Sequence, residues 1–265
     1  MTRVLSGAAL IAFGIVVVWF APIPIFEAVA VATLFAAVEE LVPLFTASGV
    51  RVPHWPTVLG ALLTLMAFST VIGGRLSLDV VLMAELIAMA LVALASWRGG
   101  SDALASISAS LFPSLYLAIP LGAMAAIRER EGPAVLSLLM LTVIVSDTAQ
   151  YYTGRMLGRR LLAEAISPKK TIEGAIGGLV FGTAVFAVVG AWWLALVPAI
   201  ARVGVGMGIV AVGIVGDLFE SMLKRSANVK DSSAIIPGHG GILDRLDALF
   251  FAAPFFYVVG RFIPQ

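Results

Sequence analysis

Apolar residues run through this chain in long stretches that glycine, proline and charged residues interrupt. A helix needs about 20 apolar residues to cross the hydrocarbon core of a bilayer. The pattern therefore predicts about nine membrane-spanning helices. They are expected at Val4–Ala21, Ile25–Phe45, Thr57–Ile72, Leu78–Trp97, Ala103–Ile127, Pro133–Tyr152, Ile172–Val197, Val203–Leu223 and Leu246–Phe262. The first stretch lacks the polar cleavage region of a signal peptide, and we expect it to be retained as a span.

Two of the connections between these helices are long and polar, Thr153–Thr171 and Lys224–Arg245. The other connections are too short to hold a soluble domain. The predicted fold is an all-α integral membrane protein, with residues 1–265 forming a single polytopic membrane domain. Within it, the spans of residues 1–130 carry no recognisable motif. Residues 131–265 hold the catalytic spans and loops.

The composition supports a membrane protein. Hydrophobic residues make up 60% of the chain and charged residues only 12%, whereas a soluble domain has about 25% charged residues. A water-soluble fold is therefore excluded. The 17 basic and 16 acidic residues nearly cancel, so the charge gives no indication of a nucleic-acid partner. The absence of cysteine excludes disulfides and thiol catalysis.

The distribution of basic residues predicts an orientation. With nine spans, 12 of the 17 lysines and arginines lie on the same side as the amino terminus. Cytoplasmic loops of membrane proteins are enriched in lysine and arginine. We therefore expect a multi-pass protein of the cytoplasmic membrane, with its amino terminus and both long loops in the cytoplasm.

Glycines recur at every fourth residue in two of the predicted spans. Gly174, Gly178 and Gly182 form one series, and Gly204 and Gly208 form another. Small residues at this spacing let helix backbones approach closely. Packing within one chain is the favoured interpretation, and a homodimer through these glycine-rich spans is the alternative.

The eighth predicted span carries charged residues at its end. On a helix, Asp217, Glu220 or Ser221, and Lys224 share one face. A carboxylate within a span is costly, and such residues usually bind ions or substrate in a polar cavity. The alternative is that Asp217 forms a buried ion pair with Lys224 or Arg225.

The loop that follows interleaves acids and bases around a glycine-rich run, Pro237-Gly238-His239-Gly240-Gly241. Such a backbone can direct several N–H groups at one anion. The flanking residues include Lys224, Arg225, Lys230 and Arg245, with Asp217, Asp231, Asp244 and Asp247. This mixture suits a polyphosphate bound through a divalent cation, and oxygen ligands favour Mg²⁺. The alternative is a solvated loop of mixed charge. For His239 we favour phosphate contact or loop shaping over proton transfer.

The other long loop supplies further candidates. Asp147 lies near the end of a span and is a second carboxylate for the site. Ser167-Pro168 marks the end of one element and the start of another, and Glu173 falls in the first turn of the next helix. Lys169 and Lys170 stand where that helix begins, a position that attracts anions. Anchoring of the loop at the membrane surface is the alternative role for these two lysines.

These residues resemble the phosphatidate cytidylyltransferases, or CDP-diacylglycerol synthases. Ser221–Asp247 resembles the family signature, and Ser167–Gly174 resembles a second block. A third block is represented by Asp147, Tyr151 and Gly154. The departures are few: Ile172 replaces a common tryptophan, Gln150 a small residue and Arg159 a lysine. The resemblance covers about the second half of the chain.

The resemblance implies transfer of CMP from CTP to phosphatidate, with release of pyrophosphate, in the lipid bilayer. Asp217 and Asp244 would be metal ligands, with Asp231 joining them, and the metal would be Mg²⁺ or alternatively Mn²⁺. The expected catalytic residues are Asp217, Asp244, Lys230 and Asp231. The expected substrate-binding residues are Asp147, Lys169, Lys170, Ser221, Lys224, Arg225, His239, Gly240, Gly241 and Arg245.

A lipid kinase and a membrane transporter are the two alternative functions. A CTP-dependent lipid kinase acting on a polyprenol would transfer the γ-phosphate instead, and the close match over Ser221–Asp247 argues against it. A membrane transporter would show internal repeats with broken helices near the bilayer midplane. The chain shows no such repeat, and its polar residues gather at one predicted surface.

Overall fold

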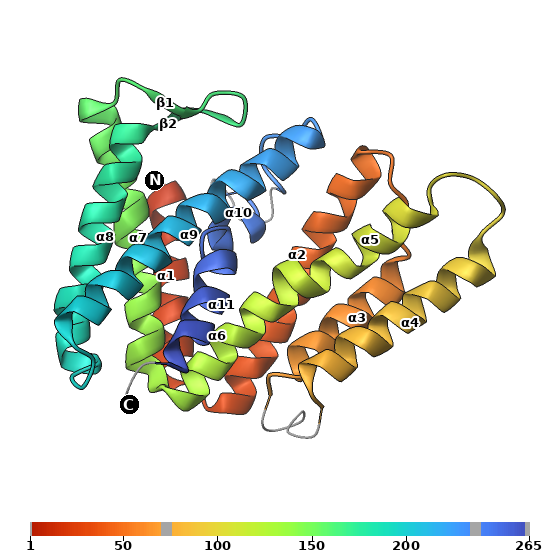
Figure 1. Cartoon of the computed structure of the whole chain (residues 1–265), viewed down its shortest axis with the longest axis horizontal. Coiled ribbons are helices and arrows are strands. Elements are labelled where there is room, and N and C mark those ends of the chain that lie inside the picture. The colour runs from red at the N-terminus through yellow and green to blue at the C-terminus, as the bar shows by residue number, and fades with distance from the viewer. Residues whose placement is uncertain (1, 70–75, 234–239, 263–265) are drawn as a thin grey trace. The chain divides into compact units, whose positions relative to one another are not determined.

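The computed structural model describes residues 2–69, 76–233 and 240–262 and is mainly helical (Figure 1). Its helices are α1 (Thr2–Phe20), α2 (Ile23–Ala47), α3 (His54–Met66), α4 (Leu78–Ser96), α5 (Ala103–Pro113), the π-helix η1 (Ser114–Ala118), α6 (Ile119–Arg130), α7 (Gly132–Leu157), α8 (Ile172–Trp193), α9 (Ala199–Ser226), α10 (Leu243–Leu246) and α11 (Leu249–Gly260). Two short strands, β1 (Leu161–Ala163) and β2 (Ser167–Thr171), complete the described elements.

Each predicted span contains a helix. Among the described residues, 6 helical stretches are long and apolar enough to cross a membrane. They are Ile23–Ala47, Leu78–Ser96, Ala103–Arg130, Gly132–Leu157, Ile172–Trp193 and Ala199–Ser226. The apolar helices Ile11–Phe20, His54–Met66 and Leu249–Gly260 are shorter. The prediction of a multi-pass, helical membrane protein is thus confirmed in its coarse form, and the number of nine spans stays a prediction.

The fifth predicted span is one helical stretch with an irregular centre. Pro113 ends α5, and the next five residues form η1 before α6 begins. A proline inside a helix removes a backbone donor and crowds the preceding turn. A π-helical turn accommodates such a disturbance without ending the helix.

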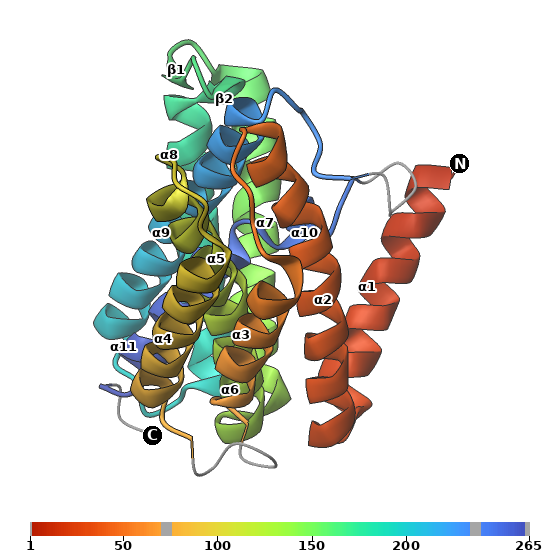
Figure 2. The same ribbon diagram turned by 90° about the vertical axis from the view of Figure 1, so that its right-hand side faces the viewer.

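The chain divides into two compact units. The first comprises residues 1–126 and 226–245, and the second comprises residues 127–225 and 246–265. In the first unit, α2 buries a stripe that includes Leu34, Ala37, Val38 and Leu41. This spacing places the four residues on one helix face. Figure 2 shows α2 beside α3 in this unit.

A buried carboxylate lies at the centre of the first unit. Glu85 of α4 accepts hydrogen bonds from the Ser114 hydroxyl at 2.6 Å and from the Thr64 hydroxyl at 3.4 Å. Gly60 of α3 leaves the space for this side chain, because a Cβ atom there would overlap the Glu85 carboxylate. Hydroxyl groups thus join α3, α4 and η1 through one acidic side chain.

The glycine series of α8 packs against α7 in the second unit, where the two helices lie side by side (Figure 1). A Cβ atom on Gly178 would overlap Gln150 and lie 3.0 Å from the Ser146 hydroxyl. One on Gly174 would lie 2.8 Å from the Gln150 carbonyl oxygen. The predicted close contact is therefore found within one chain, as the favoured interpretation had it.

The other glycine series lies on α9 and is less uniform. Gly208 faces Phe255 of α11, which would overlap a Cβ atom at that position. Gly204 faces open space, with no atom within 4 Å of where its Cβ would be. Only the second member of this pair is thus needed for close packing.

A β-hairpin lies within Thr153–Thr171, which the sequence analysis predicted as a long polar connection. Strand β1 pairs antiparallel with β2, in register Leu161 with Thr171 and Ala163 with Ser167. The structure is consistent with the predicted all-α class, but the sequence analysis did not predict these two short strands. Strand pairing depends on contacts between residues that are apart in sequence, and Pro168 within β2 is a residue that strands tolerate only at an edge. A two-stranded sheet has only edges.

The packing of α7 on α8 yields a prediction about stability. Gly178→Leu would force a large side chain against Gln150 and Ser146, and such overpacking costs about 1–3 kcal/mol. The matched control is Gly204→Leu, which places the same side chain in open space. Thermal unfolding in detergent should show a lowered Tm for Gly178→Leu alone. Equal melting temperatures for the two variants would contradict the packing described here.

Candidate active site

An ion pair joins two of the predicted site residues in the second unit. Lys170 of β2 lies against Asp217 of α9, and both side chains are about three-quarters buried. The sequence analysis assigned them to separate motifs, one to each long loop. The alternative given by the sequence analysis was an ion pair of Asp217 with Lys224 or Arg225.

Other carboxylates surround this pair. The Asp147 carboxyl of α7 lies within electrostatic range of Asp217, and Asp247, which precedes α11, lies within range of both. Gln150 donates a hydrogen bond of 3.0 Å to Asp147 Oδ1. The second unit thus gathers three aspartates from three separate segments, and Lys170 interacts with two of them, Asp217 and Asp147. Asp147 was predicted as a second carboxylate for the site, and it lies within electrostatic range of Asp217 and Lys170, while its role stays a prediction.

Gly216 of α9 allows Asp247 to come close to Asp217. A Cβ atom on Gly216, the residue before Asp217, would lie 2.6 Å from the Asp247 carbonyl oxygen and 3.0 Å from the Phe251 ring. Any larger residue would push the start of α11 away from α9. Gly216 therefore sets the close approach that brings Asp247 near Asp217.

The charged face predicted for α9 extends beyond Asp217 to Glu220 and Lys224. Lys224 Nζ lies 2.7 Å from Glu220 Oε2, and both residues are buried. This spacing of four residues suits an acid that precedes a base on a helix. Arg225 is exposed, and its Nε donates to the Ile166 carbonyl of the hairpin at 3.4 Å. Ser221, the remaining candidate on this helix, is partly exposed.

The hairpin is held at its base by Glu173. Its carboxylate accepts hydrogen bonds from the backbone N–H groups of Arg159 and Arg160, at 3.0 and 3.2 Å, and from Arg160 Nε at 3.3 Å. Thr171 caps α8, since its hydroxyl accepts from Gly174 N at 3.1 Å. Glu173 lies in the first turn of the helix, as predicted. The hairpin thereby presents Lys169 to solvent and Lys170 to Asp217.

Residues 226–245 of the family signature, which we call the signature loop, belong to the first unit. Asp244 Oδ2 accepts from Ser232 N at 3.1 Å, from the Ser232 hydroxyl at 2.9 Å and from Gly241 N at 2.8 Å. Gly240 has a φ of +77°, a conformation that favours glycine. A side chain there would also meet the Asp244 carboxylate. This loop therefore depends on its two glycines.

The N–H groups of this loop point at acidic side chains of the protein itself. Gly241 N donates to Asp244, while Ile242 N and Leu243 N each donate to Glu40 of α2 at 2.9 Å. Glu40 was not predicted as a functional residue, because the first spans were read as lacking motifs. The feature of the sequence that could have indicated a role for Glu40 is that it is a carboxylate within an apolar stretch.

The remaining predicted residues of the signature loop are accessible. Lys230, Asp231 and Arg245 are exposed, and Gly240 is partly exposed. His239 lies outside the described residues. The structure thus presents three charged side chains of this loop to solvent, while Asp244 is engaged in the loop's own hydrogen bonds.

Carboxylate oxygens are the donor atoms that the site offers to a divalent metal. Among the described residues, no group of three or more histidine and acidic side chains is arranged to hold a metal ion. Mg²⁺ is usually bound through only one or two carboxylates together with substrate phosphates and water. Asp217, with Asp147 nearby, provides oxygen ligands of this kind.

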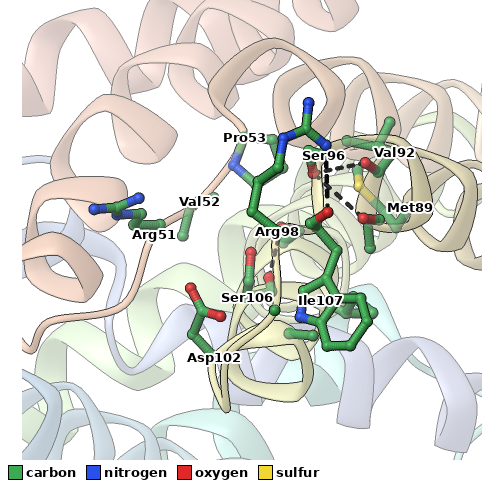
Figure 3. Close-up of a pocket in the computed structure, with 15 residues that line it drawn as sticks. Arg51, Val52, Pro53, Met89, Val92, Ser96, Arg98, Asp102, Ser106 and Ile107 are labelled. Atoms are coloured by element: carbon green, nitrogen blue, oxygen red, sulfur yellow. Dashed lines mark hydrogen bonds between the residues drawn. The ribbon is translucent and has the colours of Figure 1, made fainter.

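A pocket of about 370 Å³ also lies in the first unit (Figure 3). It is lined by residues of α4 and α5, by Arg51 of the α2–α3 connection, and by Arg98 and Asp102 of the α4–α5 connection. Arg98 Nη1 is directed to the carbonyl groups of Ala95 and Trp97 at its own helix end. None of the residues predicted to carry the chemistry lines this pocket.

The role of Glu173 can be tested by limited proteolysis. Glu173→Gln removes one of the carboxylate oxygens that accept from Arg159 and Arg160, so the hairpin should open more often. We expect trypsin to cleave after Lys169 and Lys170 several-fold faster than in the unmodified chain. Glu164→Gln is the control, since Glu164 is exposed on the same hairpin. Identical cleavage rates for both variants would show that Glu173 does not hold the hairpin.

Comparison with known proteins identifies relatives of the chain. The phosphatidate cytidylyltransferase of Synechocystis is 45% identical over 128 residues, which cover 48% of this chain and 43% of the relative. That of Haemophilus influenzae is 42% identical over 135 residues, covering 48% and 45%. That of Bacillus subtilis is 42% identical over 112 residues, covering 42% of each chain. The chain thus spans about half the length of the curated relatives it matches.

The family relationship extends further along the chain than these alignments. The sequence profile described as the Cytidylyltransferase family matches residues 1–263, which include both polar loops and all the helices described above. The resemblance found in the motifs of the second half is thereby confirmed. The chain belongs to the cytidylyltransferase family.

Proposed function

We propose that this protein transfers the CMP group of CTP to phosphatidate, giving CDP-diacylglycerol and pyrophosphate. The observation that carries the proposal is the contact of Lys170 with Asp217, since it unites a predicted phosphate-binding residue with a predicted metal ligand. The names of the relatives support the same activity. A lipid acceptor also accounts for a nucleotide-using enzyme built from membrane helices.

The reaction joins two anions. A phosphate oxygen of phosphatidate attacks the α-phosphorus of CTP, a P–O bond forms, and the bond from the α-phosphorus to the bridging oxygen of the β-phosphate breaks. The electron pair of the broken bond leaves with pyrophosphate. The attacking phosphate is already an anion, so no strong base is required. The site must instead cancel the repulsion between the reactants and stabilise the leaving group.

The residues of the second unit suit that task. Lys170 is a cation held beside Asp217, and Lys169 is an exposed cation on the same strand. In this proposal both lysines contact phosphate oxygens. Arg225 and the buried Lys224 add positive charge at the end of α9. The cluster of Asp147, Asp217 and Asp247 provides the negative charge that a bound cation requires.

The proposed cation is Mg²⁺, with Mn²⁺ as an alternative, held by Asp217 with Asp147 nearby. When bound, it would neutralise phosphate charge and stabilise the pyrophosphate that leaves. The family resemblance assigns a metal role to Asp244 and Asp231 as well. The hydrogen bonds on Asp244 Oδ2 keep that carboxylate in one orientation. Asp231 is exposed and accessible to ligands.

The signature loop contributes the remaining proposed contacts. Lys230 and Arg245 are exposed cations that suit the phosphates of CTP, and Ser221 and His239 are proposed as hydrogen-bonding groups. Gly240 and Gly241 allow the backbone to approach a ligand closely. A long, flexible lysine and a planar arginine offer complementary ways of meeting phosphate oxygens.

We also propose that the amino terminus and both polar loops face the cytoplasm, where CTP is available. The absence of cysteine permits a direct test with single-cysteine variants. Glu164→Cys on the hairpin should react with an impermeant maleimide only in inverted membrane vesicles. Leu196→Cys, between α8 and α9, should react only from the opposite side. The reverse pattern would overturn the orientation.

The activity is tested with purified protein, phosphatidate, Mg²⁺ and CTP labelled separately at the α- and γ-phosphates. Label from the α-phosphate should enter the lipid fraction, and pyrophosphate should be released. Label from the γ-phosphate in the lipid would instead establish a lipid kinase. Absence of label from the lipid in both experiments would reject nucleotide-dependent lipid transfer.

In the same assay, Asp217→Asn should lower the turnover on the order of 100-fold or more, because it removes charge at the proposed centre. The control is Asp79→Asn, a matched change at an exposed position of α4 outside the proposed site. It should leave the turnover unchanged. Substantial activity of Asp217→Asn at any Mg²⁺ concentration would remove Asp217 from the mechanism.

A further inference from the structure

Glu40 lies on α2, far in sequence from every predicted site residue, yet its carboxylate contacts the signature loop. The residue is only 2% exposed. An ionised carboxylate in such surroundings is stable only when hydrogen bonds or a cation compensate its charge. All the hydrogen bonds described for it come from residues of the signature loop.

The carboxylate accepts four hydrogen bonds, two on each oxygen. Oε1 accepts from the Ser233 hydroxyl at 2.7 Å and from Ile242 N at 2.9 Å. Oε2 accepts from the Ser232 hydroxyl and from Leu243 N, both at 2.9 Å. The serines precede the glycine-rich run, whereas Ile242 and Leu243 follow it. One side chain therefore holds the two flanks of this run together.

The sequence of the loop is adapted to this contact. A Cβ atom on Gly241 would overlap both the Glu40 carboxylate and the Ser232 hydroxyl. Glycine at this position thus lets the loop backbone close over Glu40. The close approach brings the N–H groups of the next two residues within hydrogen-bonding distance of the carboxylate.

The contact extends to a residue of the proposed mechanism. The Ser232 hydroxyl lies 2.9 Å from Glu40 Oε2 and 2.9 Å from Asp244 Oδ2. A hydroxyl group has one hydrogen, which the two carboxylates share. Ser232 N also donates to Asp244. The orientation of the Asp244 carboxylate is therefore linked to the position of Glu40 through one serine.

We propose that Glu40 is a positioning residue, which orders the signature loop for CTP by accepting these hydrogen bonds. The proposal rests on the proposed function, because it concerns the loop that carries Lys230, Asp244 and Arg245. Glu40 itself does not touch the reacting atoms in this scheme. It acts by holding the loop backbone, and with it the side chains that meet the nucleotide.

The chemistry of the contact makes Glu40→Gln an informative variant. An amide has one oxygen and one NH₂ group, so it cannot accept two hydrogen bonds at each end. Either serine hydroxyl can rotate to accept from the NH₂ group. The N–H of Ile242 or Leu243 cannot do so, and one of them loses its acceptor in either orientation of the amide.

The first test is trypsin digestion of the purified protein. Glu40→Gln should accelerate cleavage after Lys230 and Arg245, which lie in the signature loop, by about tenfold. Cleavage after Lys169 and Lys170 in the hairpin should keep its rate. The matched control is Glu39→Gln, a change at the adjacent, exposed residue, whose carboxylate pairs with His54 at 3.0 Å. It should alter neither rate.

The second test is steady-state kinetics in the α-label assay. For Glu40→Gln, we expect the KM for CTP to rise about tenfold, while the KM for phosphatidate changes much less. Glu39→Gln should match the unmodified enzyme in both constants. A variant that had merely lost stability would have less active protein, and so a lower apparent kcat, without this selective change in KM.

The outcomes separate this inference from the proposed function. Unchanged cleavage after Lys230, or equal acceleration in the loop and the hairpin, would overturn the positioning role. A selective change in cleavage would support ordering of the loop even if the unmodified chain transferred no cytidylyl group, and that result would reject the proposed function alone. An unchanged KM for CTP in an active enzyme would overturn the link to the nucleotide.

A second pair of variants covers the case in which Glu40→Gln fails to fold. Ser233→Ala removes one hydrogen bond to Glu40, and Ser232→Ala removes the hydroxyl shared with Asp244. Both should accelerate cleavage after Lys230, and Ser232→Ala should do so more strongly. Cleavage at the unmodified rate in both variants would contradict the proposal.

Discussion

A carboxylate that lies among apolar helices must receive hydrogen bonds or a cation, because an uncompensated charge there costs several kcal/mol. This protein meets the requirement in different ways. Glu40 accepts from two hydroxyl groups and two backbone N–H groups, and Glu85 accepts from two hydroxyl groups. Asp217 and Glu220 are each paired with a lysine. Most of these contacts join segments that are distant in the sequence, so charge compensation also organises the fold.

Glycine makes much of this compensation sterically feasible. Gly60 leaves room for the Glu85 carboxylate, and Gly241 lets the signature loop close over Glu40. Gly216 allows Asp247 to approach the helix that carries Asp217. The chain thus places small residues where acidic side chains or their backbone neighbours must come close. The glycine series of α8 likewise lacks side chains, and this lets α8 pack closely against α7.

The predictions from sequence agree with the structure for properties that depend on one helix alone. The positions of the predicted spans agree with the helices, and the face shared by Asp217, Glu220 and Lys224 follows from helical periodicity. For Asp217, the sequence analysis favoured ion or substrate binding and gave an ion pair with Lys224 or Arg225 as the alternative. Lys224 pairs instead with Glu220, four residues away on its own helix, and Asp217 pairs with Lys170 of the hairpin. The signature of the family could be read directly, whereas the function of Glu40 could not.

The sequence by itself determined that the chain is apolar enough to form membrane helices, where these helices lie to within several residues, and to which family the motifs belong. These properties depend on composition, on periodicity and on residues that are close together in the chain. Only the tertiary structure decided that residues 161–171 form a hairpin, that Lys170 meets Asp217, and that Glu40 binds both flanks of the glycine-rich run. Each of these features depends on which distant segments come together to satisfy a buried charge or an unpaired backbone group, and no local pattern encodes that choice.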